Sequence, residues 1–127
     1  MSVSVRYIVN DVDAAISFYT EMLGFKVDIH PAATFAIISK DDFRLMLSRP
    51  GGSGGGGGQA MADGEVPTPG GWNRIQIAVE DLPGTVTRLK NAGARFRNEI
   101  LVGIGAKQIL LQDPSGNLIE LFEQLRA

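Results

Sequence analysis

The chain contains an internal repeat, and this repeat constrains its fold more than any other feature of the sequence. Residues 5–25 follow the order strand, acidic corner, amphipathic helix and glycine-containing exit, and residues 75–96 follow the same order. Asp11 and Asp81 mark the equivalent corners. Each copy continues into short apolar strands, so each is predicted to be a β-α-β-β-β module. A repeat of this kind sets the architecture of the whole chain.

Alternation and helical spacing predict the elements of the first copy. Residues 3–9 alternate as a strand that is buried on one face. Asp11 or Asp13 can cap the following helix, and Gly24 supplies its C-terminal stop. Three further strands are predicted at 25–30, 34–39 and 43–48, separated by Pro31 and by a polar turn at 40–42.

The second copy is predicted to contain the same elements in the same order. Residues 73–79 form a strand and residues 82–92 form a helix, with Pro83 in its first turn, where a missing N–H does little harm. Strands are predicted at 94–100, 106–111 and 117–122, and residues 113–116 form the last turn.

A glycine-rich segment, residues 50–72, lies between the two modules. Polyglycine pays a large ordering entropy and has no side chain to bury, so the segment is interpreted as a flexible linker. A mobile lid over a pocket, with Met61 and Trp72 as apolar contacts, is the alternative. The chain is therefore predicted to be one domain, 1–127, with a first module at 1–49 and a second module at 73–127.

Composition excludes several classes of function. The formal net charge is −2, and the scattered Lys and Arg residues give no reason to expect a nucleic-acid partner or an anionic membrane. The absence of cysteine removes disulfides and thiolate chemistry. No apolar run approaches the roughly 20 residues of a membrane span, and no signal pattern is present, so we expect a cytoplasmic protein without membrane contact.

Two motifs resemble those of a known family. Residues 9–25, with Asp11, Phe18-Tyr19 and Leu23-Gly24-Phe25, and residues 113–122, Asp-Pro-Ser-Gly-Asn-Leu-Ile-Glu-Leu-Phe, are similar to the vicinal oxygen chelate superfamily. This superfamily includes glyoxalase I, bleomycin-resistance proteins and extradiol dioxygenases. The resemblance implies an α+β fold, in which two β-α-β-β-β modules form curved mixed sheets around a concave pocket. The fold hosts unrelated reactions and also pure binding proteins.

The resemblance also locates the metal ligands of the metal-dependent members, on the first and last strands of each module. In this chain those positions carry Ser4, Met46, Arg74 and Glu120. Glu120 alone suits a divalent ion, and a permanently charged arginine repels one. The sequence therefore predicts no metal and no cofactor. The lone histidine, His30, is interpreted as a structural residue rather than a ligand or a base.

Alternation predicts which strand residues point away from the helices. These faces carry several arginines and glutamines and one glutamate, whereas the opposite faces are almost wholly aliphatic. A buried charge must be paired, so Arg74 is predicted to lie against Glu120, near the place that a metal occupies in the enzymes. The alternative is a structural salt-bridge network that stiffens the sheet.

Three functions are compatible with these residues. The leading prediction is a metal-independent small-molecule binding protein, with an anionic or carbonyl-bearing ligand in a pocket between the modules. Leu110 is a further wall residue, and the predicted ligand-binding residues are Arg6, Arg44, Met46, Trp72, Arg74, Gln76, Gln108, Leu118, Glu120 and Phe122.

The second prediction is a lyase or isomerase, in which Glu120 is the catalytic acid or base and Arg74 or Arg6 stabilises an oxyanion. A metal-dependent glyoxalase or dioxygenase ranks last, and the sequence leaves open whether the protein is an enzyme. The open sheet edges need covering, so we also expect a homodimer.

Overall fold

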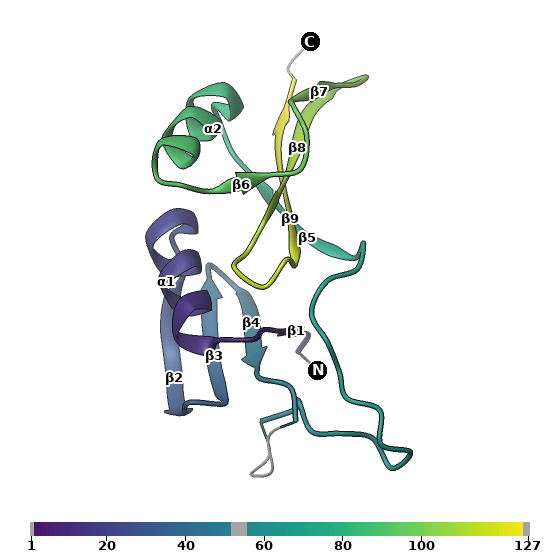
Figure 1. Ribbon diagram of the computed structural model, residues 1–127. Helices are drawn as coiled ribbons and strands as arrows, with labels where there is room; N and C mark the ends of the chain where they lie inside the picture. Colours follow the sequence, from purple (N-terminus) through teal and green to yellow (C-terminus); the bar gives the residue numbers. More distant parts are fainter. Residues whose placement is uncertain (1, 52–55, 126–127) are drawn as a thin grey trace. The chain divides into compact units, whose positions relative to one another are not determined.

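The computed structural model describes residues 2–51 and 56–125 and shows two compact units, Met1–Gly70 and Gly71–Ala127 (Figure 1). Each unit pairs one helix with one mixed sheet, as the repeat predicts. The predicted α+β class, with two β-α-β-β-β modules, is therefore confirmed. No helix in the described part of the chain has the length and apolar character that crossing a membrane requires.

The first unit is a four-stranded sheet with one helix on one face. Strand β1 runs parallel to β4, and the other neighbours are antiparallel, in the order β1-β4-β3-β2. Helix α1 packs against β2, β3 and β4. The elements are β1 (Val5–Ile8), α1 (Val12–Leu23), β2 (Lys26–Ala32), β3 (Phe35–Lys40) and β4 (Phe43–Ser48).

Local sequence explains both ends of α1. Asp11 is the N-cap, and its side chain accepts a hydrogen bond from the Ala14 N–H at 3.1 Å. Gly24 ends the helix with a φ of 75°, a conformation that glycine adopts without a steric penalty. The apolar stripe of the helix is buried against the sheet and consists of Val12, Ala15, Phe18, Tyr19 and Leu23.

The second unit has the same plan. Strand β5 runs parallel to β9, β9 pairs with β8, and β8 pairs with both β6 and β7. Asp81 caps α2 by accepting from the Gly84 N–H at 3.1 Å. The elements are β5 (Arg74–Ala78), α2 (Leu82–Asn91), β6 (Arg95–Phe96), β7 (Leu101–Val102), β8 (Ala106–Gln112) and β9 (Leu118–Gln124).

The strand predicted at 94–100 is interrupted, and only its first residues form β6. The backbone N–H of Arg97 still donates to the Leu110 carbonyl at 2.8 Å. The Leu110 N–H, however, donates to the side-chain oxygen of Asn98 at 2.9 Å instead of to a backbone carbonyl. An asparagine side chain that replaces a backbone acceptor ends regular pairing at that point.

Pro31 was predicted to separate two strands, but it lies inside β2. Strand β2 is at the edge of its sheet, and its register with β3 shifts between Ile29 and Ala32. A proline has no N–H for the ladder, so an irregular edge strand is where a sheet tolerates it.

Residues 56–58 of the glycine-rich segment contact the end of β4 and the residues that follow it. Gly51 N–H donates to the Gly58 carbonyl at 2.7 Å, and the Ser48 hydroxyl donates to the Gly56 carbonyl. Residues 52–55 lie outside the described residues. The linker and lid interpretations of 50–72 therefore stay predictions for the segment as a whole.

Candidate functional site

The second sheet has one aliphatic face and one polar face. Gln76 pairs with Glu120 and Arg74 pairs with Leu118, so both β5 residues share the face of Glu120. On β8, Leu110 is opposite Glu120, and Gln108 lies two residues away on the same face. The other face packs toward α2 and buries Ile109, Leu111, Ile119 and Leu121. The prediction from alternation that these residues share one face is confirmed.

The buried carboxylate of Glu120 is the centre of this polar face. Its Oε1 accepts a hydrogen bond from Arg74 Nε at 3.0 Å, and Arg74 Nη2 lies 2.9 Å from the same oxygen. Its Oε2 accepts from Gln76 Nε2 at 2.6 Å. With the Gln108 amide oriented to satisfy both groups, Gln108 donates to Oε2 at 2.8 Å. The predicted contact between Arg74 and Glu120 is confirmed.

This arrangement neutralises Glu120 and holds it in place. Glu120 is 6% exposed, and a buried carboxylate needs hydrogen-bond donors for both of its oxygens. Arg74 supplies the opposite charge, and the two glutamines supply neutral donors. Glu120 is therefore an organising acceptor for three side chains, and its carboxylate oxygens already have partners.

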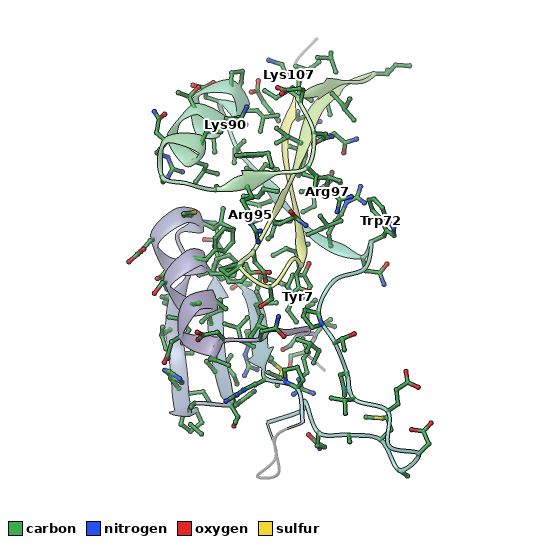
Figure 2. All side chains as sticks on the ribbon, in the orientation of Figure 1. Tyr7, Trp72, Lys90, Arg95, Arg97 and Lys107 are labelled. Carbon is green, nitrogen blue, oxygen red and sulfur yellow. The ribbon has the colours of Figure 1, made fainter. Side chains whose placement is uncertain are left out.

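Trp72 and Arg97 extend the polar face. The Arg97 Cζ atom lies 5.2 Å from the centre of the Trp72 ring, and Figure 2 shows the two side chains lying together. Trp72 is 67% exposed, and its carbonyl lies 3.4 Å from Arg74 Nη1. Trp72 thus supplies an exposed apolar ring, and Arg97 supplies a cationic group beside it.

Arg97 is a candidate site residue that the sequence analysis missed. Its position follows from the antiparallel register, because Arg95 pairs with Gln112 and Phe96 pairs with Leu111. One further step places Arg97 opposite Leu110, on the face of Glu120. Alternation indicates that Arg95 and Arg97 share a face, but only the register with β8 shows that this is the face of Glu120.

The first unit has its own cationic face. Arg6 is the register partner of Met46, and Arg6 Nη2 lies 3.8 Å from the Met46 sulfur. Arg44 lies two residues before Met46 on β4 and is exposed. Within the described part of the chain, neither arginine contacts a carboxylate. Both charges are therefore available to an anion.

The predicted site residues thus fall into two sets, one in each unit. Leu118 is buried at 1% exposed, whereas Phe122 is partly exposed. Phe122 and Ala78 line an open hollow of about 810 Å³ at the ends of β5 and β9. The first set is Arg6, Arg44 and Met46, and the second is Trp72, Arg74, Gln76, Gln108, Leu118, Glu120 and Phe122.

At the positions where the resemblance places the ligands of metal-dependent members, the residues of this chain do not fit a divalent ion. The Arg74 guanidinium forms an ion pair with the Glu120 carboxylate, and its permanent positive charge repels a metal ion. Within residues 2–51 and 56–125, no three His, Cys, Asp or Glu side chains group as a ligand set. His30 instead lies 3.6 Å from Asp13 Oδ1, on the exposed edge strand β2.

Comparisons with known proteins support the fold. The family model "Glyoxalase/Bleomycin resistance protein/Dioxygenase superfamily" matches residues 3–121. The chain is similar to TnmS3, an antibiotic binding protein from Streptomyces sp. CB03234, with 20% identity, 98% of this chain and 97% of that chain covered, and a TM-score of 0.73. It is also similar to lactoylglutathione lyase from Agrobacterium tumefaciens, with 19% identity, 96% and 92% covered, and a TM-score of 0.72.

A third similar structure is a member of the same superfamily from Sphaerobacter thermophilus DSM 20745, with 22% identity, 98% of both chains covered, and a TM-score of 0.72. At these identities the likeness shows the fold alone. No curated protein sequence matches the chain. The family model confirms the resemblance to this superfamily that the sequence motifs indicate.

We expect Arg74→Ala to lower the free energy of unfolding by about 2 kcal/mol, because it leaves the buried Glu120 carboxylate without its charged donor. In a Glu120→Gln background the same substitution should cost less, since a neutral amide needs no cation. Urea denaturation measures both values.

The matched control is Arg44→Ala, which removes an exposed arginine without a carboxylate partner and should change the unfolding free energy by no more than about 0.5 kcal/mol. Equal losses for Arg74→Ala and Arg44→Ala would contradict the role given to the Glu120 contacts.

Proposed function

Because this chain belongs to the glyoxalase/bleomycin resistance protein/dioxygenase superfamily, we propose that it is a metal-independent binding protein for a small molecule with an anionic or carbonyl oxygen. The observation that carries the proposal is the distribution of charge on the two sheet faces. Glu120 is saturated by Arg74, Gln76 and Gln108. Among the residues that the structure describes, no carboxylate pairs with the remaining arginines on these faces.

Recognition of the ligand would combine charge with apolar contact. A guanidinium presents a planar set of donors that matches a carboxylate or phosphate. Arg6 and Arg44 offer such donors in the first unit, and Arg97 offers them beside the Trp72 ring in the second. Small-molecule sites commonly join apolar walls to a few polar anchors of this kind. The predicted pocket between the modules remains part of the proposal.

The similar structures include both a binding protein and an enzyme, and the site favours the first class. One of them is described as an antibiotic binding protein and another as a lyase. A general base needs a carboxylate lone pair directed at the substrate. Both oxygens of Glu120 instead accept hydrogen bonds from neighbouring side chains, so proton transfer would require these bonds to break. The lyase or isomerase reading has no observation of its own in support.

A homodimer is also proposed, because the first sheet has an open edge. All seven residues of β2 are exposed, and Val27 and Ile29 are 44% and 48% exposed on this edge strand. An exposed edge strand with apolar side chains is a template for pairing with another chain.

We expect light scattering after gel filtration to give twice the 13.6 kDa mass of one chain. Val27→Lys should restore the single-chain mass, since a charge on the edge disfavours pairing. Val66→Lys, at a similarly exposed valine outside the strands, is the matched control and should remain dimeric. A wild-type protein that is monomeric at micromolar concentration would rule out the dimer.

Thermal-shift measurements with a matched ligand panel test the proposed function. The panel contains aromatic and aliphatic carboxylates, phosphate monoesters, and the corresponding neutral amides and amines. We expect the anions to raise the melting temperature, since a ligand at 100 times its Kd adds about 2.7 kcal/mol to stability. Trp72 is the only tryptophan, so its fluorescence reports whether the ligand reaches the Arg97 face.

Arg44→Gln and Arg97→Gln should each reduce the shift produced by an anion. Arg88→Gln removes the same charge from the exposed surface of α2 and should leave the shift unchanged. Amines that stabilise the protein as strongly as carboxylates, or an Arg88→Gln variant that weakens binding equally, would contradict the proposal.

A further inference from the structure

The backbone of Gly57 lies directly against the guanidinium group of Arg6. A Cβ atom built on Gly57 would overlap the Cζ, Nε and Nη1 atoms of Arg6. Gly57 also has a φ of 88°, in the region that favours glycine. A larger residue at this position would therefore displace the Arg6 side chain, which can move, or the glycine segment itself.

Backbone contacts hold the residues around Gly57 in place. The buried Ser48 hydroxyl donates to the Gly56 carbonyl, and the Gly58 carbonyl accepts from the Gly51 N–H at 2.7 Å. A Cβ on Gly58 would overlap the Arg49 carbonyl oxygen, so this position too admits no side chain. Residues 56–58, the glycine strap, are therefore packed as bare backbone on the first unit.

The Arg6 guanidinium also contacts Met46. Arg6 Nη2 lies 3.8 Å from the Met46 sulfur, and the two residues are register partners on β1 and β4. The guanidinium thus contacts a thioether and a glycine backbone, neither of which neutralises its charge. These two contacts restrict the guanidinium, and its charge remains available.

We propose that Gly57 is a positioning residue, which holds Arg6 in one orientation so that its guanidinium can bind an anionic oxygen of the ligand. An arginine that is already oriented loses less side-chain entropy when it binds, and this favours affinity. The role in ligand binding rests on the proposed function, whereas the positioning of Arg6 by the glycine strap does not.

Methyl NMR of the four methionines tests the positioning without a ligand. The Met46 methyl resonance, assigned with Met46→Leu, reports on the guanidinium beside its sulfur. We compare the wild type with Arg6→Ala, Gly57→Ala and Gly64→Ala. Gly64 is the matched control, because its φ of 90° imposes the same backbone strain and a Cβ there would meet no atom within 4 Å.

We expect the Met46 resonance to shift in both Arg6→Ala and Gly57→Ala and to stay in place in Gly64→Ala. The Met61 resonance should show the reverse dependence, because the Gly64 N–H donates to the Met61 carbonyl at 2.9 Å. Circular dichroism verifies that each variant is folded. A Met46 resonance that is unchanged in Gly57→Ala, or in Arg6→Ala, overturns the proposal.

Titration with benzoate then separates the positioning from the proposed function. We expect Gly57→Ala to weaken benzoate binding about tenfold, close to the effect of Arg6→Ala, and the double variant to bind no more weakly than Arg6→Ala alone. If Gly57→Ala moves the Met46 resonance but benzoate binds none of the proteins, the positioning stands and the proposed anion site on the first unit fails. Additive losses in the double variant would contradict a role of Gly57 through Arg6.

Discussion

The buried carboxylate of Glu120 is the interaction on which the polar face of the second sheet depends. Glu120 is 6% exposed, and a buried charge needs an opposite charge or hydrogen-bond donors. The Arg74 guanidinium supplies the opposite charge, and the side-chain amides of Gln76 and Gln108 donate hydrogen bonds. These contacts join β5, β8 and β9. They are also the basis for proposing a metal-independent binding protein, because both oxygens of the carboxylate already accept hydrogen bonds.

The two units have the same strand pairing but place different charged groups at the paired positions. Arg6 pairs with Met46 in the first unit, and Gln76 pairs with Glu120 at the equivalent place in the second. In the second unit a neutral amide donates to a carboxylate, whereas in the first a cation rests on a thioether. The strand pairing is therefore the same in the two units, whereas the charges differ. The arginines of the first sheet are the basis of the proposal that the ligand is an anion.

Features that follow from strand alternation and from the pairing of a buried charge could be predicted, and contacts that depart from the repeating pattern could not. Alternation in 106–111 and 117–122 placed Glu120 and its neighbours on one face, and the cost of burying a charge then identified Arg74 as its partner. The interruption near Asn98 depends on its side-chain oxygen, which accepts a hydrogen bond from the Leu110 N–H 12 residues away, and alternation does not report this contact.

Gly57 and Pro31 illustrate the same limit. The glycine run predicts a flexible linker, since nothing in its composition indicates that one member packs against Arg6. Pro31 predicts a strand break unless the strand is known to lie at a sheet edge, which is a property of the assembled sheet. The role of the candidate residues in ligand binding stays a prediction, because binding depends on a molecule that the sequence does not specify.

Calorimetric titration of the wild type with zinc, nickel and manganese tests the central claim about Glu120 most directly. With Arg74 paired to the carboxylate, we expect no stoichiometric binding of any of the three ions, and Glu120→Gln should behave like the wild type. One equivalent of metal bound by the wild type and lost in Glu120→Gln would show that the carboxylate is a ligand and would contradict the account.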